Sequence, residues 1–431
     1  MNILRKKILF SAIFLIVSRM LVAAPTDTIS VMVYNLLFYG HYTSFCTPVN
    51  NNVDDKDGYL KTIIDHTLPD IFAVNEMGPN AALAQRILNN VMNTNGRTHY
   101  AHATFTNTTG SNLVNMLFYN TNRFQLYDEA VVANVLRDIN LYSLYYDDPD
   151  LALGADTLFI HILVAHLKAG SSASDQQTRM QEVSSMMGYI EQKEIRGNVL
   201  FMGDFNMNSS FEQAYQLLTW HPNEEIRFYD PVGQSGVWWN NPDMAPWHTQ
   251  STRVGSHDCF VTGGMDDRYD QIIVTQSIME GTRGLHYVTD SYKTIGQDGQ
   301  RFNQSLITPP NHSEPPDVIS ALFNMSDHLP VKLSLAVTDF VSSVAGLDNT
   351  PGFVTVNIPG EKFEIIFDDK TGPAKLEVFD ARGVVVDRRI LNIDTLPYPI
   401  SVNISFLQPG TYLVRVSLEG MKPVVQRLIV L

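Results

Sequence analysis

Cysteine is scarce in this chain of 431 residues, which contains only Cys46 and Cys259. Neither belongs to a paired CxxC motif, and the sequence has no HExxH motif, so the usual zinc-binding patterns are excluded. The two cysteines lie far apart along the chain. Their spacing therefore leaves open whether they form a disulfide or remain two unpaired thiols.

Positive charge is also in short supply, because 30 Lys and Arg residues stand against 45 Asp and Glu residues and give a formal net charge of -15. Tight, salt-sensitive wrapping of nucleic acid by a basic surface is therefore disfavoured. An enzyme that engages nucleic acid briefly, through a metal ion and a small local patch, remains compatible with this charge. The length of the chain predicts two domains.

Long apolar runs are confined to the N-terminus. Residues 1–24 combine a basic start, Arg5 to Lys7, with an apolar run over 8–17 and small residues at the end, which is typical of a secretory signal peptide. The other interpretation is a short membrane anchor, which Arg19 disfavours by interrupting the apolar stretch. No later stretch is long enough to span a bilayer. We therefore expect a secreted or cell-surface protein with no membrane span once the signal is removed.

The pattern of apolar residues changes about four fifths of the way along the chain. Residues 25–340 alternate strand-length runs rich in Val, Ile and Phe with helical patterns, such as the one over 175–192, and this indicates an α/β domain. Over 353–431 helical periodicity disappears, and short strand-like runs separated by turn residues predict a small β-sandwich. Residues 341–352 are interpreted as the linker.

Polar residues recur where the apolar runs of the first domain end or begin. These residues are Asn35, Glu76, His166, Asp204, Asn206, Asp270, Asp327 and His328. A lone acid at a strand end is most often a turn residue, and a lone histidine is most often a hydrogen-bonded core residue. So many coincidences instead indicate one shared site at a sheet edge. Carboxylate and amide oxygens suit Mg²⁺, Mn²⁺ or Ca²⁺, and such an ion beside two histidines suits attack of water on a phosphorus ester.

The motifs that carry these residues resemble those of the metal-dependent endonuclease/exonuclease/phosphatase superfamily, which includes deoxyribonucleases and neutral sphingomyelinases. The motifs are YN at 34–35, NE at 75–76, HLKAG at 166–170, GDFN at 203–206, DDRYDQI at 266–272 and SDHLPV at 326–331. The resemblance covers about residues 28–338. It implies a deoxyribonuclease-like four-layer αββα sandwich, with two sheets inside and helices outside, followed in this chain by the small all-β sandwich.

The resemblance also implies a metal site and a water-activating pair. Glu76 is implied as the main metal ligand, with Asn35 and Asp327 helping to shape that metal site. Asp204 is implied to activate the attacking water, and Asn206 to orient the water or the phosphate. The implied cofactor is Mg²⁺, with Mn²⁺ or Ca²⁺ as alternatives.

Two histidines receive catalytic roles from the same resemblance. His328 is implied to contact the scissile phosphate, with Asp270 orienting its ring. His166 stands where the deoxyribonuclease branch has a catalytic histidine and other branches have a tyrosine.

Five further residues are weaker candidates for substrate binding, and each has a structural alternative. They are Lys168, Arg179, Arg253, Trp238 and Trp239. Lys168, inside the HLKAG motif, and Arg179, which follows that motif, are candidates for contact with phosphate. The alternative interpretations are a surface lysine and a helix-packing arginine. Arg253 is a candidate for contact with a nucleic acid backbone. The tryptophan pair is interpreted as stacking on bases, dipping into a lipid surface, or packing as a loop lid.

The C-terminal unit resembles a type IX secretion sorting domain through VFDARGVVV at 378–386 and LQPGTYLVRVSLEG at 407–420. That resemblance implies a β-sandwich recognised by secretion machinery at the outer membrane. The chain has Gln426 and Arg427 where a lysine pair is common in that family. A generic adhesion or carbohydrate-binding β-sandwich is the other interpretation.

Together these patterns predict a secreted, divalent-metal-dependent phosphodiester hydrolase that is a monomer. The favoured interpretation is a non-specific extracellular nuclease that acts on DNA, RNA or both. A lipid headgroup phosphodiesterase similar to the sphingomyelinases, or a phosphatase of the same fold, is an alternative. An inactive surface binding protein is another. MDDRYDQ at 265–271 stands in place of the PAWCDR-type motif of the inositol phosphatase branch and disfavours that branch.

Overall fold

The structure of the chain is a computed structural model. The residues that it describes are 27–147, 157–338 and, in the C-terminal part, 353–358, 362–367, 372–380, 384–392, 400–408, 410–418 and 424–430. The predicted signal peptide over 1–24 and the predicted linker over 341–352 lie outside the described residues.

Seven strands form the first sheet. In spatial order they are β11 (Leu285–Tyr287), β13 (Val331–Val337), β1 (Asp27–Tyr39), β2 (Ile71–Met77), β4 (Val114–Asn120) and β3 (Tyr100–His102), with β12 (Lys293–Thr294) also paired to β13. β1 runs parallel to β2 and antiparallel to β13. The ends of β1 and β2 and the start of β13 therefore lie at the same edge of this sheet.

Six strands form the second sheet. In spatial order they are β5 (Phe124–Asn134), β6 (Asp138–Tyr146), β7 (Phe159–His166), β8 (Val199–Asp204), β10 (Asp270–Thr275) and β9 (Phe228–Tyr229). β8 runs parallel to β7 and antiparallel to β10. The ends of β7 and β8 and the start of β10 therefore share one edge of this sheet as well.

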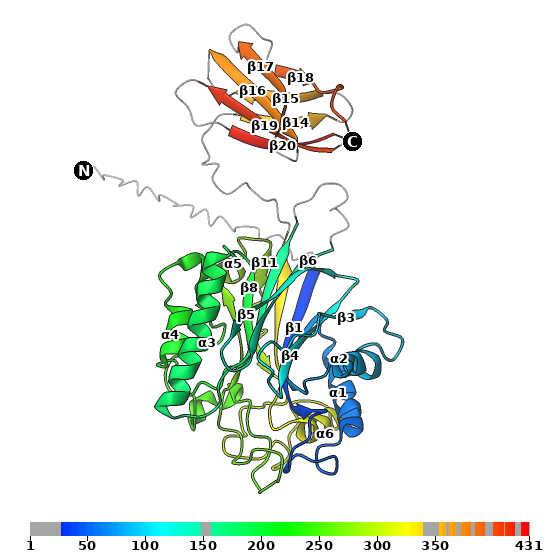
Figure 1. Ribbon diagram of the computed structural model, residues 1–431, viewed down its shortest axis with the longest axis vertical. Coiled ribbons are helices and arrows are strands. Elements are labelled where there is room, and N and C mark those ends of the chain that lie inside the picture. The colour runs from blue at the N-terminus through cyan, green and yellow to red at the C-terminus, as the bar shows by residue number, and fades with distance from the viewer. Residues whose placement is uncertain are drawn as a thin grey trace, which may run out of the picture.

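The two sheets pack on each other, and helices cover their outer faces. One continuous cluster of buried apolar side chains includes residues from both sheets. The helices on one side are α3 (Ala173–Gln192) and α4 (Gln213–Thr219), and those on the other side are α1 (Val53–Thr67), α2 (Ala81–Ile87) and α6 (Pro316–Met325) (Figure 1). Shorter helical segments are η1 (Leu88–Met92), η3 (Glu224–Ile226), η4 (Pro242–Trp247) and α5 (Gln276–Glu280). This arrangement confirms the predicted αββα sandwich.

Helix α3 illustrates how local sequence builds an outer layer. Ser172 and Asp175 form a capping box, in which each side chain accepts a hydrogen bond from the backbone N–H of the other residue. Val183, Met187 and Ile190 recur at helical spacing and are buried in one cluster with strands of the second sheet. Burial of each such side chain contributes roughly 1.5–3 kcal/mol to the free energy of unfolding.

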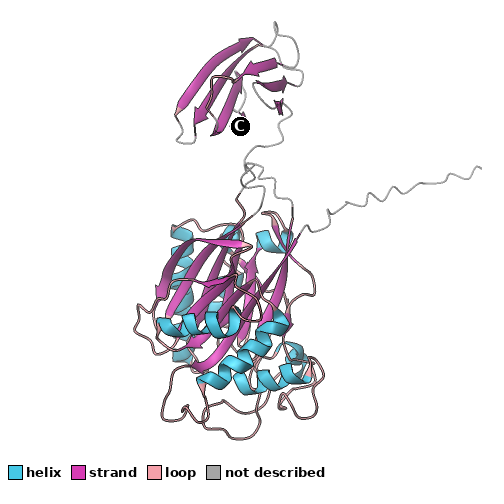
Figure 2. Cartoon of the chain, turned by 90° about the vertical axis from the view of Figure 1, so that its right-hand side faces the viewer, coloured by secondary structure: helices cyan, strands magenta, loops and turns pink. Residues whose placement is uncertain are grey.

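The described residues of the C-terminal part form two antiparallel sheets. One has β14 (Phe353–Ile358), β15 (Lys362–Phe367) and β18 (Ile400–Asn403), and the other has β17 (Val385–Asn392), β16 (Pro373–Asp380), β19 (Gly410–Leu418) and β20 (Val424–Val430) (Figure 2). Buried apolar side chains from both sheets, including Leu376 and Val402, make a separate small core. The predicted all-β character of this part is confirmed.

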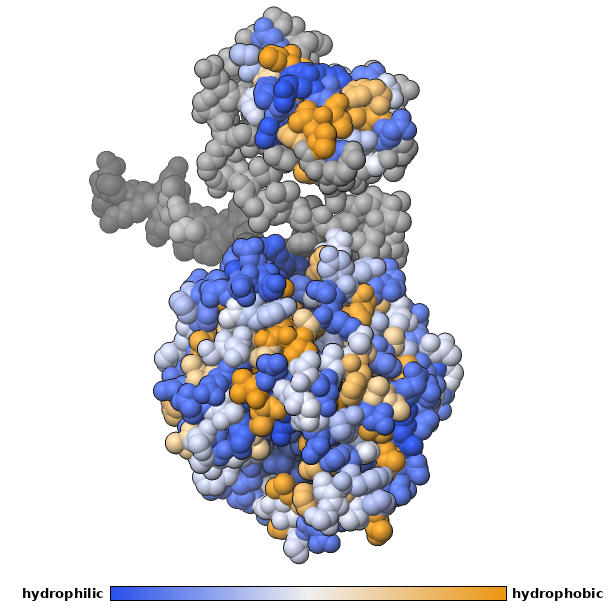
Figure 3. Space-filling view, viewed as in Figure 1, coloured by the Kyte–Doolittle hydropathy of each residue, from blue (hydrophilic) through white to orange (hydrophobic). Residues whose placement is uncertain are grey.

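Apolar residues do not form a continuous belt on the face drawn in Figure 3. Small apolar groups lie there among polar residues across the larger part of the chain (Figure 3). None of the helices in the described ranges is long and apolar enough to cross a membrane.

Candidate active site

Most of the predicted site residues come from strand ends that the two sheets bring to one edge. Asn35 lies near the end of β1, Glu76 near the end of β2, and His166 at the end of β7. Asp204 ends β8 and pairs across the second sheet with both His166 and Asp270. The Asn35 amide nitrogen then joins the sheets, because it donates to Glu76 Oε1 at 3.1 Å and to Asp204 Oδ2 at 3.0 Å.

The glycine of the GDFN motif allows β7 and β8 to approach closely at this edge. Gly203 pairs with Ala165 in the strand register and has a φ of 145°. A Cβ atom on Gly203 would lie 1.8 Å from the carbonyl oxygen of Ala165. Since only glycine fits there, it is this residue that allows His166 and Asp204 to lie side by side.

Two carboxylates and one imidazole form a group that fits a metal ion. In the described part of the chain, the ligand atoms of Glu76, His166 and Asp204 all lie within 4.8 Å of one another. His166 Nε2 lies 3.8 Å from Glu76 Oε1 and 3.5 Å from Asp204 Oδ2. This donor set suits a divalent cation of the Mg²⁺ or Mn²⁺ kind. It shares Glu76 with the predicted metal ligands and adds two residues that were predicted as catalytic.

The end of β1 explains the orientation of Glu76 and of Asn35. The pairing of β1 with β2 shifts register after Asn35, and Leu37 and Phe38 have φ values of 46° and 51°. This bulge points the Phe38 N–H at Glu76 Oε2 (3.1 Å) and the Leu37 N–H at Asn35 Oδ1 (3.0 Å). The Asn35 amide oxygen thus accepts from the backbone and its nitrogen faces the carboxylates, so Asn35 lies where it can shape the metal site, and its direct ligation of a metal stays a prediction.

Asp327 lies beside Glu76, but it is outside the group of three ligands. Its Oδ2 accepts a hydrogen bond from the Val261 N–H at 2.9 Å, and the Gln250 amide nitrogen lies 3.4 Å away. Burial raises the pKa of Glu76, and the nearby charge of Asp327 raises it further. A bound divalent cation would remove this penalty on two neighbouring carboxylates.

Asp204 and Asn206 are held in the site by backbone contacts. The Asp204 N–H donates to Asn75 Oδ1 at 3.1 Å, and the Asn206 N–H donates to Asp204 Oδ1 at 3.1 Å. The strand ends at Asp204, and Asn206 has a φ of 53° rather than an extended conformation. Its amide nitrogen donates to the Leu167 carbonyl at 3.3 Å, which ties the GDFN segment to the segment after β7.

His328 and Asp270 form a tight buried pair opposite the metal-competent group. His328 Nδ1 lies 2.7 Å from Asp270 Oδ2. Its other ring nitrogen, Nε2, faces the site, 3.9 Å from Asp204 Oδ2 and 2.7 Å from the Gln250 amide nitrogen. This geometry agrees with the predicted orientation of His328 by Asp270.

The electrostatics of the site separate the two histidines. Burial alone would lower the pKa of His328, but the carboxylates of Asp270 and Asp204 raise it well above its usual range, so the ring is charged at neutral pH. Burial, aided by Arg137 and His328, lowers the pKa of His166 well below its usual range, so that ring is neutral. Burial also raises the pKa of Asp204 to about 7, although His328 opposes the rise.

Sequence reasoning missed several residues that organise the site. Asn75 lies inside the NE motif, and its amide nitrogen donates to Asn115 Oδ1 at 2.8 Å and to the Ala165 carbonyl at 3.1 Å. Gln250 contacts His328 from a loop that carries no recognisable motif. Arg137, half-buried in the turn between β5 and β6, donates to the His166 carbonyl at 3.2 Å. The position of Asn75 beside Glu76 was the one available signal.

Two of the weaker predictions are wrong. Arg179 does not face the site, because it is fully buried and bonds Glu212 and the carbonyls of Lys168 and Gly170. It therefore organises the segment after β7 rather than binding phosphate. Trp238 is also fully buried, and its indole N–H donates to the Gln234 carbonyl at 3.0 Å, so its role is packing.

The other three weak candidates remain accessible to different degrees. Lys168 is paired with Asp175 at 2.8 Å, which occupies its charge near the start of α3. Trp239 is 51% exposed, and its backbone N–H donates to the Asn208 carbonyl, two residues beyond Asn206. Arg253 is half-buried and lies between the loop before β10 and helix α6.

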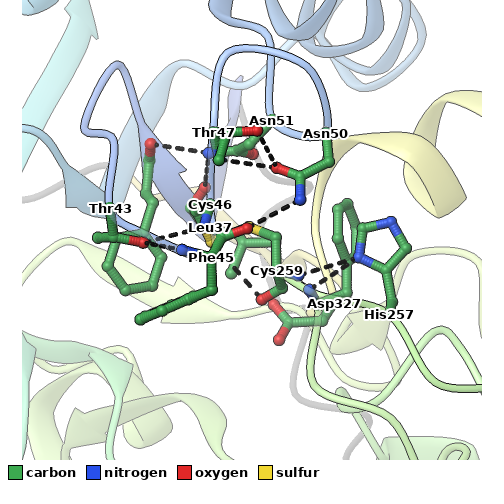
Figure 4. The surroundings of a disulfide bond; sticks show 12 residues. Leu37, Thr43, Phe45, Cys46, Thr47, Asn50, Asn51, His257, Cys259 and Asp327 are labelled. Carbon is green, nitrogen blue, oxygen red and sulfur yellow. Dashed lines mark hydrogen bonds between the residues drawn. A yellow bond between two sulfur atoms is a disulfide. The ribbon is translucent and has the colours of Figure 1, made fainter.

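Cys46 and Cys259 form a disulfide, which resolves the question that the sequence left open. The bond joins the loop after β1 to the loop that carries Val261, and Figure 4 shows Asp327 next to this junction. Leu37 and Phe260 pack with the disulfide in a small buried cluster. The cross-link therefore fixes two of the loops that flank the site.

No protein-family model matches this sequence, and no curated protein matches it. Solved structures with a similar course of the chain include the endonuclease/exonuclease/phosphatase from Bacteroides vulgatus, at 15% identity and a TM-score of 0.43, which covers 72% of this chain and 100% of that one. D. rerio TDP2 complexed with single-strand DNA product is similar at 12% identity and a TM-score of 0.44, over 72% and 99% of the two chains. The human Nocturnin catalytic domain with bound sulfate is similar at 16% identity and a TM-score of 0.43, over 72% and 95%. The case for function rests on the geometry of the site.

Proposed function

We propose that this chain hydrolyses phosphodiester bonds with the help of a bound divalent metal ion. The observation that carries the proposal is the grouping of Glu76, Asp204 and His166 within 4.8 Å, opposite the buried pair of His328 and Asp270. When bound by these three side chains, a divalent cation supplies neutralisation of phosphoryl oxygens and stabilisation of the leaving oxygen.

Asp204 is the proposed general base. Burial raises its pKa to about 7 in the metal-free site, and a bound cation would lower that pKa, so near neutral pH the carboxylate would be ionised and able to accept a proton from water. The Asn206 N–H, bonded to Asp204 Oδ1, and the Asn35 amide, bonded to Oδ2, fix the carboxylate in one orientation. A water molecule held against Asp204 is thereby directed at the phosphorus atom.

His328 is the proposed donor to the phosphoryl oxygens. The carboxylates of Asp270 and Asp204 raise its pKa well above the usual range, and Nε2 faces Asp204 and the interior of the site. We assign the proton that His328 donates to this nitrogen, with the Gln250 amide turned so that its oxygen accepts from it. Asp270 holds the other ring nitrogen and prevents rotation of the imidazole. A fixed charged donor of this kind stabilises the negative charge that develops on the phosphoryl group.

Arg137 supplies a further cation beside the site, close enough to lower the pKa of both Glu76 and His166. One guanidinium nitrogen donates to the carbonyls of His166 and Leu167, which leaves the rest of the group available. It takes part in no ion pair within the described part of the chain. We assign it to the binding of a phosphoryl oxygen of the substrate.

A nucleic acid strand is the proposed substrate. The half-exposed Trp239 lies next to the segment after Asn206 and offers a face on which a base can stack. The strongly negative chain, with a net charge of -15, favours weak binding without sequence preference, through a few local contacts. We further propose that the signal over 1–24 and the C-terminal unit over 353–431, with type IX secretion machinery as its partner, export the protein as a monomer.

A panel of substrates tests this function. The purified chain is assayed with Mg²⁺ or Mn²⁺ against double-stranded DNA, RNA, sphingomyelin vesicles and a simple phosphomonoester, with Asp204→Ala and His328→Ala alongside. We expect cleavage of nucleic acid that both substitutions abolish. Absence of turnover on every substrate, with intact folding, would favour an inactive binding protein.

A lipid headgroup phosphodiester is the second candidate substrate. The observation that favours it is the set of exposed apolar side chains on the two loops that the disulfide joins, next to Asp327. Phe45, Val254 and Val261 are 48%, 49% and 53% exposed. Cleavage of sphingomyelin in the panel without cleavage of DNA or RNA would replace the nucleic acid substrate and keep the proposed chemistry.

A further inference from the structure

A small polar pocket of about 170 Å³ lies between the start of α1 and the loop that precedes β10. Its volume far exceeds the roughly 10–15 Å³ that one water molecule requires. Among the residues that line it are Asn50, Asn51, Asp55, Lys56, Arg253 and His257. Figure 4 shows Asn50, Asn51 and His257 next to the disulfide that joins the two loops. The pocket is thus a built feature with walls fixed to each other.

Lys56 is buried in the wall of this pocket without a carboxylate partner. It is 2% exposed, and its ammonium group donates to the Leu36 carbonyl at 2.7 Å and to the Leu37 carbonyl. An ammonium group has three N–H donors, so one remains. No ion pair forms between Lys56 and an acid in the described ranges. Burial lowers its pKa to about 7 despite the fields of Asp327 and Glu76.

Arg253 is a second cation in the same wall with unfilled donors. Its guanidinium group lies between the rings of Phe260 and Phe323, 4.4 Å and 3.7 Å from their centres. One terminal nitrogen donates to the Phe323 carbonyl at 3.0 Å, whereas the buried Nε has no hydrogen-bond partner. Within the described residues it also lacks an acidic partner. The stacked rings fix the guanidinium plane and leave its edge for a ligand.

The third donor is His257, whose tautomer is set by the backbone. Its Nδ1 accepts hydrogen bonds from the N–H groups of Cys259 (3.2 Å) and Phe260 (3.1 Å). Burial, with the charge of Arg253, lowers the pKa of this ring, so it is neutral and carries its proton on Nε2. Asp55 is the one acid that lines the pocket, and its side chain is exposed at the start of α1.

A buried ammonium group and a half-buried guanidinium group without acidic partners are costly, and an anion between them relieves that cost. Arg guanidinium and Lys ammonium groups are the side chains that most often bind phosphoryl oxygens in proteins. We propose that this pocket binds a phosphoryl anion, with Arg253, Lys56 and His257 as its donors. The anion is either a second phosphate of the substrate or free phosphate. The first of these two sources rests on the proposed function.

Phosphate binding is measured first, on the purified chain stripped of metal with EDTA so that the carboxylate site cannot retain phosphate through an ion. Calorimetric titration with inorganic phosphate is compared for the wild type, Arg253→Met, which keeps the aliphatic packing between the rings, and Arg253→Lys, which restores a charge. Arg227→Met is the matched control, because Arg227 pairs with Glu224 away from the pocket. We expect at least tenfold weaker binding in Arg253→Met, partial recovery in Arg253→Lys and no change in the control.

Activity then distinguishes the two sources of the anion. The ratio of kcat/KM for an oligonucleotide to kcat/KM for bis(4-nitrophenyl) phosphate, which has one phosphate, is compared between wild type and Arg253→Met. A tenfold fall in this ratio assigns the pocket to a second substrate phosphate, and an unchanged ratio with weakened phosphate binding assigns it to free phosphate.

Equal phosphate affinity in wild type and Arg253→Met would overturn the inference. The inference would also be overturned if Arg253→Met changed only the half-saturating metal concentration and left phosphate binding unchanged. Arg253 and Lys56 would then serve only as counter-charges for Asp327 and Glu76. Phosphate binding that depends on Arg253 in a chain without turnover would uphold the inference and reject the proposed function. Turnover in a chain that shows no Arg253-dependent phosphate binding would uphold the proposed function and reject the inference.

Discussion

Breaking the disulfide is expected to destabilise the larger, N-terminal part of the protein substantially. Cys46 and Cys259 lie 213 positions apart, so the chain-entropy relation assigns their cross-link about 5 kcal/mol at 25 °C. The perturbation is the Cys46→Ala/Cys259→Ala double variant, which avoids placing a hydroxyl in the buried cluster around the bond. Urea unfolding is followed by tryptophan fluorescence, which reports only on this part because all four tryptophans lie between residues 220 and 247.

The same substitution is expected to lower activity in the protein that remains folded. Val261, two positions after Cys259, donates to Asp327 at 2.9 Å, so freeing the loop weakens a contact to the site. A loss of less than about 1 kcal/mol in the free energy of unfolding would refute the reasoning, since it would mean that the loops are fixed without the cross-link. Cys46→Ala alone serves as a control and should reproduce most of the loss.

Two further outcomes are expected. Asp270→Asn removes the charge that holds the pKa of His328 high, so an NMR titration should detect a fall in that pKa. We also expect kcat to drop by about 10²–10⁴-fold. An unchanged kcat would contradict a catalytic role for the pair of His328 and Asp270. Glu182 is buried, and burial raises its pKa from 4.5 to about 7, so the stability that it contributes is present below about pH 4.5 and is lost as pH rises through about 7. Glu182→Gln should therefore flatten the urea stability curve between these pH values by up to roughly 3 kcal/mol, and an identical pH dependence in both proteins would contradict this.

The site could be predicted from sequence where a polar residue interrupts an apolar run. Glu76 and Asp204 lie at the ends of strands and His328 shortly precedes one, so their proximity follows from sheet geometry. The bulge that orients Asn35 and Glu76 depends on positive φ values at Leu37 and Phe38, which no periodicity encodes.

Residues whose setting depends on tertiary packing could not be predicted. The sequence around Lys56 is typical of a solvent-facing lysine in the polar first turns of a helix. Lys56 is buried because α1 packs over the bulge of β1. Trp238 and Trp239 are neighbours in sequence, yet the loop backbone buries one and exposes the other. Arg179 is buried because Glu212, on a separate segment, supplies its counter-charge.

The most direct test of the metal-dependent site is the hydrolysis of bis(4-nitrophenyl) phosphate by the purified chain after EDTA treatment and after Mg²⁺ or Mn²⁺ is restored. Wild type is compared with Asp204→Asn and Glu76→Gln, which keep the shape of the two carboxylates and remove their charge. We predict no turnover in EDTA, recovery with metal, and at least about a hundredfold loss in both variants. Turnover that survives EDTA, or full activity in both variants, would contradict the account.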